Sequence, residues 1–175
     1  FLLRLSALTL GWLDHREDVA EMRSAIGLVP PGSRILVATP DESSWVRLAP
    51  PRHKVFHHAP QLASLPTLAV IERSAFVSTL YALPSQHSLQ LKEPYRHLGG
   101  AGSVAIPTLA DLQSAIDQRR SPGSTPKQIQ RWRQEFDFVL LLYAYGPGAD
   151  ALKGNLPLVP RFDGKTFDLF EIHHP

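Results

Sequence analysis

Four charged residues are the candidates for a ligand-binding site in this chain. Asp41 and Glu42 come directly after a short apolar run at residues 34–39, and Glu72 and Arg73 follow a second apolar run. If both runs are parallel strands, the four side chains meet at the carboxyl edge of the sheet, where α/β proteins bind ligands. Carboxylates there suit a cation or the hydroxyl groups of a sugar. The sequence thus predicts a ligand-binding crevice, and solvated loop residues are the simpler interpretation.

Two further motifs have residue types that metal and cofactor sites use. His53 and His57 stand four residues apart, which on a helix would present two imidazoles to zinc, but the surrounding prolines disrupt a helix. Residues 100–105 (GAGSVA) fit the loose pattern of a dinucleotide-binding turn, which needs a strand before it and a helix starting within it. Ile106 and Pro107 separate the motif from the next helix, so a surface loop is expected. We predict no metal, no cofactor and no identifiable catalytic residue.

Length, cysteine content and net charge exclude several classes of protein. Its 175 residues are enough for a single domain with its own core. The absence of cysteine excludes disulfides, thiolate metal sites and a cysteine nucleophile. The formal net charge of +2 is too small to predict a nucleic-acid partner. The oligomeric state is left open.

Periodicity and turn residues predict an α/β fold for the first half of the chain. Asp14 and Glu17 have the spacing of a capping box, so we expect a helix that begins there and ends at Gly27. Short apolar runs rich in β-branched residues predict buried strands. The central strands are expected near residues 34–39, 67–72 and 137–143, and a weaker strand at residues 76–81.

The second half of the chain adds helices and a hairpin. Thr108 with Asp111 forms another capping box, and Thr125 followed by Pro126 marks the start of the next helix, which turns Ile129, Trp132 and Phe136 inward. Asp163-Gly164 predicts a turn between two C-terminal strands, and Pro160 places the first of these at an edge. The expected fold is a three-layer α/β sandwich with a mixed, largely parallel sheet of about five strands and a C-terminal β-hairpin.

The first 13 residues form an apolar leader before the single α/β domain of residues 14–175. Arg4 is the one charged residue of this leader, which is shorter than the roughly 20 residues of a membrane span. Its leucines are spread around a helix rather than along one stripe, so periodicity does not decide its role. Two interpretations stay open. The leader is a first helix packed on the core, or it is the membrane-proximal end of a domain that follows a transmembrane helix, with Trp12 at the interface.

Three apolar stretches carry a resemblance to a class of membrane protein. They are residues 31–37 (PGSRILV), 68–77 (LAVIERSAFV) and 136–140 (FDFVL). There the chain resembles the soluble C-terminal domain of uncharacterised bacterial multi-spanning membrane proteins, some of which are similar to lipid-linked-sugar glycosyltransferases. The resemblance implies a domain on the periplasmic face of the bacterial inner membrane. It implies the membrane-embedded remainder of the same protein as partner and a carbohydrate or lipid-linked sugar as substrate. The catalytic motif of that family has no counterpart here.

We therefore expect a non-catalytic, extracytoplasmic domain of a bacterial integral membrane protein that assists glycosyl transfer or substrate recognition. The alternative is a small stand-alone domain or enzyme that binds a sugar or nucleotide in the crevice near Asp41 and Glu72. A third hypothesis is an interaction module whose leader packs on a partner helix.

Overall fold

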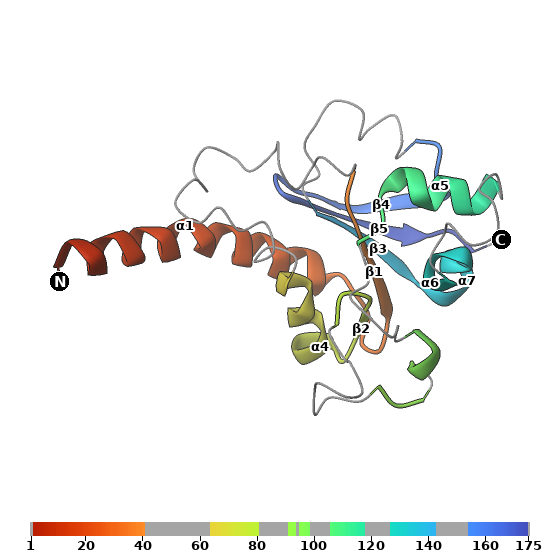
Figure 1. The fold of residues 1–175 in the computed structure, drawn as a ribbon, viewed down its shortest axis with the longest axis horizontal. Coiled ribbons are helices and arrows are strands. Elements are labelled where there is room, and N and C mark those ends of the chain that lie inside the picture. The colour runs from red at the N-terminus through yellow and green to blue at the C-terminus, as the bar shows by residue number, and fades with distance from the viewer. Residues whose placement is uncertain are drawn as a thin grey trace.

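A five-stranded sheet with helices on both faces forms the body of the molecule (Figure 1). The computed structural model describes residues 2–40, 64–80, 91–93, 95–98, 106–117, 127–142 and 154–174. Within these residues the fold is a three-layer α/β sandwich with a C-terminal hairpin, which confirms the predicted fold class.

The sheet has the strand order β2-β1-β3-β5-β4 and is mixed. β1 is parallel to both of its neighbours, whereas β5 is antiparallel to β3 and to β4. Pro160 lies in the edge strand β4, where its missing N–H removes no bond from the interior of the sheet. The strand bounds are β1 Arg34–Ala38, β2 Phe76–Val77, β3 Phe138–Leu142, β4 Leu158–Asp163 and β5 Phe167–Ile172.

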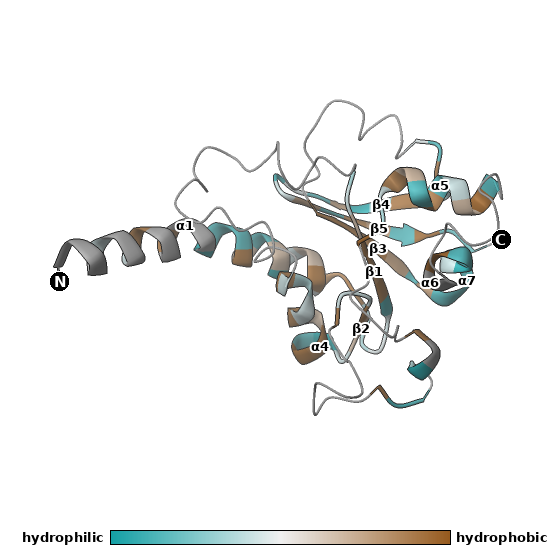
Figure 2. Ribbon diagram, in the orientation of Figure 1, coloured by the Kyte–Doolittle hydropathy of each residue, from teal (hydrophilic) through white to brown (hydrophobic). Residues whose placement is uncertain are grey.

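Successive side chains of the central strands are buried on opposite faces of the sheet. Ile35 and Val37 of β1 pack in the core under helices α1 (Leu2–Gly27) and α4 (Leu68–Arg73). Leu36 and Ala38 pack in the core under α5 (Leu109–Asp117), α6 (Lys127–Gln130) and α7 (Trp132–Glu135). Every residue of β3 is buried, because helices cover both faces of this strand. Figure 2 shows the apolar residues concentrated on these strands. The continuous apolar runs in the sequence follow from this two-sided burial.

Helix α1 (Leu2–Gly27) runs without a break through the predicted leader and into the body of the molecule. The expectation of a helix start at the Asp14–Glu17 capping box is wrong. A capping box marks a helix start only where the preceding residues do not favour a helix themselves, and leucine and alanine in the leader favour it strongly. The predicted end at Gly27 is confirmed. Within the described residues, no helix has both the length and the apolar character needed to cross a membrane.

The predicted strand at residues 67–72 is wrong, because this segment is helical. The short 3-10 helix η2 (Leu65–Thr67) leads directly into α4 (Leu68–Arg73), which ends at Ser74 in the left-handed conformation. Only Ala69 of α4 is fully buried, so the segment covers the sheet rather than joining it. A short apolar run has no period that distinguishes a helix from a buried strand. The predicted strand at residues 76–81 exists as the two-residue β2.

The other face of the sheet is covered by α5 (Leu109–Asp117), α6 (Lys127–Gln130) and α7 (Trp132–Glu135), with the 3-10 helix η3 (Arg96–Leu98) nearby. The capping box before α5 is confirmed, because the Asp111 N–H donates to Thr108 Oγ1 (3.1 Å) and the Thr108 N–H donates to Asp111 Oδ2 (3.0 Å). Trp132 is buried, and its indole N–H donates to the Leu112 carbonyl (3.2 Å). Thr125 and Pro126 lie outside the described residues.

Candidate functional site

Glu72 and Arg73 are the two predicted site residues that the structure describes, and both connect α4 to α1. Glu72 Oε1 accepts a hydrogen bond from Arg23 Nε at 2.8 Å. An Arg73 amino group donates to the Gly27 carbonyl at 2.7 Å, where α1 ends. A cation at a helix C-terminus is favoured by the helix dipole and by the unpaired carbonyls there. The observed contacts of Glu72 and Arg73 are therefore those of a junction between helices α1 and α4.

This junction lies at the amino end of β1. The Gly32 N–H, just before β1, donates to the Arg73 carbonyl at 3.0 Å. The sequence placed Glu72 and Arg73 beyond the carboxyl end of a strand, and the helical conformation of α4 removes the basis of that placement. Asp41 and Glu42 lie outside the described residues, so the crevice predicted for all four side chains stays a prediction.

The carboxyl ends of the neighbouring strands β1 and β2 each lead into a threonine, Thr39 and Thr79. The Thr39 N–H donates to the Pro107 carbonyl and the Leu109 N–H donates to the Thr39 carbonyl, which joins β1 to the start of α5. The side-chain oxygens of Thr39 and Thr79 are buried and have no hydrogen-bond partner in the part of the chain that the structure describes. Buried hydroxyls without a partner are uncommon in folded proteins. No motif in the sequence marks either threonine.

At the amino end of the sheet, Arg34 and Asp137 join β1 to β3. Arg34 donates to both carboxylate oxygens of Asp137, at 2.6 and 3.1 Å, and its backbone N–H donates to Asp137 Oδ2 at 2.8 Å. Partial burial raises the pKa of Asp137, but these hydrogen bonds and the charge of Arg34 outweigh it and hold the pKa below its ordinary value. The pair is a structural connection between neighbouring parallel strands.

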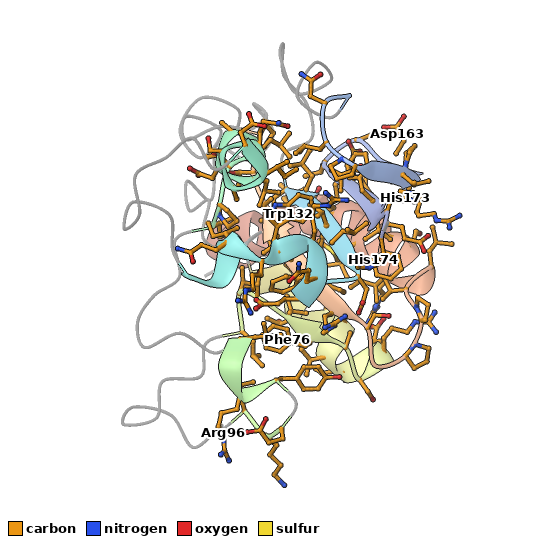
Figure 3. The ribbon with its side chains drawn as sticks, turned by 90° about the vertical axis from the view of Figure 1, so that its right-hand side faces the viewer. Phe76, Arg96, Trp132, Asp163, His173 and His174 are labelled. Atoms are coloured by element: carbon orange, nitrogen blue, oxygen red, sulfur yellow. The ribbon has the colours of Figure 1, made fainter. Side chains whose placement is uncertain are left out.

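A pocket of about 480 Å³ lies between α5 and α7. Figure 3 views the molecule from this end and labels two of the lining residues, Trp132 and His174. Two arginines and a histidine line the pocket: Arg131, Arg133 and His174. Among the described residues that line it, none is acidic. In the sequence, arginines flank the buried Trp132 on both sides, which is the one signal there that points to this pocket.

In the part of the chain that the structure describes, no three histidine, aspartate or glutamate side chains are grouped so that they could hold a metal ion. His53, His57 and residues 100–105 fall outside that part. No family model, no curated protein and no solved structure matches the chain. The resemblance to glycosyltransferase-type membrane proteins therefore stays a prediction.

Proposed function

We propose that this chain is a non-catalytic, extracytoplasmic domain of a bacterial integral membrane protein, and that it assists recognition of a carbohydrate or lipid-linked substrate. The membrane-embedded remainder of the same protein is its proposed partner, and the periplasmic face of the inner membrane its proposed location. The observation that carries this proposal is the N-terminal half of α1.

That half of α1 extends well beyond the sheet (Figure 1). Leu10 and Leu13 have exposed fractions of 63% and 52%, whereas Met22 and Ile26 in the C-terminal half of the helix are buried. Arg4 is the one charge among the first 13 residues. Exposed leucines on a helix that extends away from the core favour a surrounding of lipid or of other helices over water. A membrane-embedded partner would provide such a surrounding.

Three ion pairs among the described residues have a structural role. Arg23 with Glu72, Arg34 with Asp137, and Arg161 with Glu171 are ion pairs that connect one helix or strand to the next. In each pair the two charges serve a junction in the fold rather than a substrate. The pairs therefore favour a scaffold or recognition role for the described body of the domain.

Fractionation of cells that express the intact gene tests the proposal. We expect the product in the membrane pellet, resistant to extraction with alkaline carbonate, and we expect alkaline phosphatase fused after Pro175 to be active. Recovery of the product in the carbonate supernatant would overturn the proposal. An inactive phosphatase fusion alongside an active fluorescent-protein fusion would overturn the periplasmic location.

The role assigned to α1 is tested on the 175-residue chain with vesicles of phosphatidylethanolamine and phosphatidylglycerol. Replacing Leu10 and Leu13 by serine should lower the fraction of the chain that floats with the vesicles by more than about tenfold. Each leucine buried in lipid contributes about 1.5 kcal/mol or more to the free energy of binding. The control replaces Leu28 and Ile71, which are 53% and 82% exposed on the body of the domain, by serine. Equal losses in the two double variants would contradict a specific role of α1.

A further inference from the structure

We propose that the pocket between α5 and α7 binds a small organic phosphate through Arg131 and Arg133. This inference does not depend on the proposed membrane location, because it concerns the opposite end of the molecule. The N-terminus lies at one end of the long axis and the helices of the pocket lie near the C-terminus at the other (Figure 1). A phosphate in solution reaches this end without contact between α1 and lipid.

The break between α6 and α7 is what brings the two arginines to one pocket. In a continuous helix, residues two positions apart face different sides. Arg131 is not helical, with φ −119° and ψ 27°, and it separates Gln130 of α6 from Trp132 of α7. The change of direction at this residue lets Arg131 and Arg133 line the same pocket.

Neither arginine has an acceptor among the described residues, in contrast to Arg23, Arg34, Arg73 and Arg161. Arg133 is half-buried, and its Nε atom is shielded from solvent and has no hydrogen-bond partner in the described part of the chain. An unsatisfied buried donor is costly, and the donor here belongs to a cation. An anionic oxygen from a ligand would satisfy it.

The surroundings of the arginines favour a phosphate. Glu135 and Asp137 follow the arginines along the chain and Asp117 follows Ile116 of α5, but none of the three is among the described lining residues. Asp137 is already bonded to Arg34. His174 adds a further donor at the rim. The planar guanidinium group matches the geometry of phosphate oxygens and binds them through two parallel hydrogen bonds.

The size and the apolar wall of the pocket indicate a ligand larger than inorganic phosphate. A volume of about 480 Å³ lies in the range of small-molecule sites. Ala115 and Ile116 of α5 form an apolar side opposite the arginines, and Gln134 offers an amide to a hydroxyl group. A phosphorylated monosaccharide combines these features in a molecule of suitable size.

Calorimetric titration with glucose 1-phosphate tests the proposal, with glucose and inorganic phosphate as comparisons. We expect a dissociation constant in the micromolar to millimolar range for glucose 1-phosphate and weaker binding of inorganic phosphate. Glucose should not bind up to about 10 mM. Replacing Arg131 and Arg133 together by glutamine should weaken binding by more than about tenfold. Arg16→Gln, which removes an exposed charge from α1, should leave the affinity unchanged.

The Trp132 indole N–H provides a second readout, because it is hydrogen-bonded to Leu112 beside the pocket. Its NMR signal should shift on addition of glucose 1-phosphate in the wild-type chain and not in the double variant. Binding of phosphatidylglycerol vesicles that depends on Arg131 and Arg133 would reassign the site to a lipid headgroup and overturn the proposal. Absence of binding, or equal binding by the double variant, would also overturn it.

Discussion

Asp137 is the residue whose charge joins the amino ends of the two central parallel strands. Its carboxylate accepts three hydrogen bonds from Arg34, and both side chains retain an exposed fraction of 32%. Partial burial acts to raise the pKa of Asp137, and the hydrogen bonds from Arg34 lower it by more. An aspartate with a lowered folded-state pKa stabilises the fold when it is ionised.

Replacing Asp137 by asparagine should lower the free energy of unfolding at neutral pH by about 1 kcal/mol, since the pair is partly solvated. The difference from wild type should persist above the unfolded-state pKa of about 3.9 and disappear as the pH falls through the lower folded-state pKa. Urea denaturation between neutral pH and about pH 2 measures this. Glu171→Gln, which breaks the more exposed pair with Arg161, should cost less than about 0.5 kcal/mol. A pH-independent difference for Asp137→Asn would contradict the assignment.

At the scale of elements, the docking of α1 on the sheet depends on the turn between β4 and β5. Glu21 Oε1 accepts hydrogen bonds from the backbone N–H groups of Thr166 (2.7 Å) and Phe167 (3.0 Å), which are both buried residues. A Cβ atom at Gly164 would overlap this carboxylate oxygen and also the backbone carbonyl of Phe167, which cannot move aside, so the turn beside α1 requires glycine. The hairpin therefore sets where α1 lies.

We expect Glu21→Ala to lower the free energy of unfolding by about 2 kcal/mol, because two buried N–H groups lose their acceptor. Glu21→Gln keeps a carbonyl oxygen at the same position and should cost less than about 1 kcal/mol. Urea denaturation of the two variants at neutral pH measures the difference. Equal losses would show that the charge of Glu21, and not its acceptor oxygen, holds the turn.

At the scale of the whole molecule, α1 is one helix with two environments. Its C-terminal half is buried against α4 and β5 and contributes Met22, Ala25 and Ile26 to the core, whereas Leu10 and Leu13 remain exposed. An isolated helix as short as the N-terminal half of α1 is marginally stable in water. The stability of backbone hydrogen bonds should therefore differ along α1.

Hydrogen exchange in the absence of lipid should show this gradient. Amides of residues 22–27 should exchange only on global unfolding, and those of residues 6–13 at least about a hundredfold faster. Addition of phosphatidylglycerol vesicles should slow exchange in residues 6–13 alone if that half lies in a membrane environment. Uniform protection along α1 without vesicles would contradict the division of the helix into two environments.

The apolar runs at residues 34–39 and 137–143 were sufficient to predict two central strands, and the Asp163-Gly164 turn with Pro160 was sufficient for an edge hairpin. These signals are local, because a strand buried on both faces must be apolar throughout and a turn residue acts on its own backbone. Whether residues 68–73 form a strand or a helix was decided by tertiary contacts: Ala69 is buried against the sheet, and Glu72 and Arg73 are bonded to α1. The pocket between α5 and α7 likewise depends on the helix break at Arg131 and on lining residues that are distant from one another in the sequence. No local pattern in the sequence encodes such an arrangement.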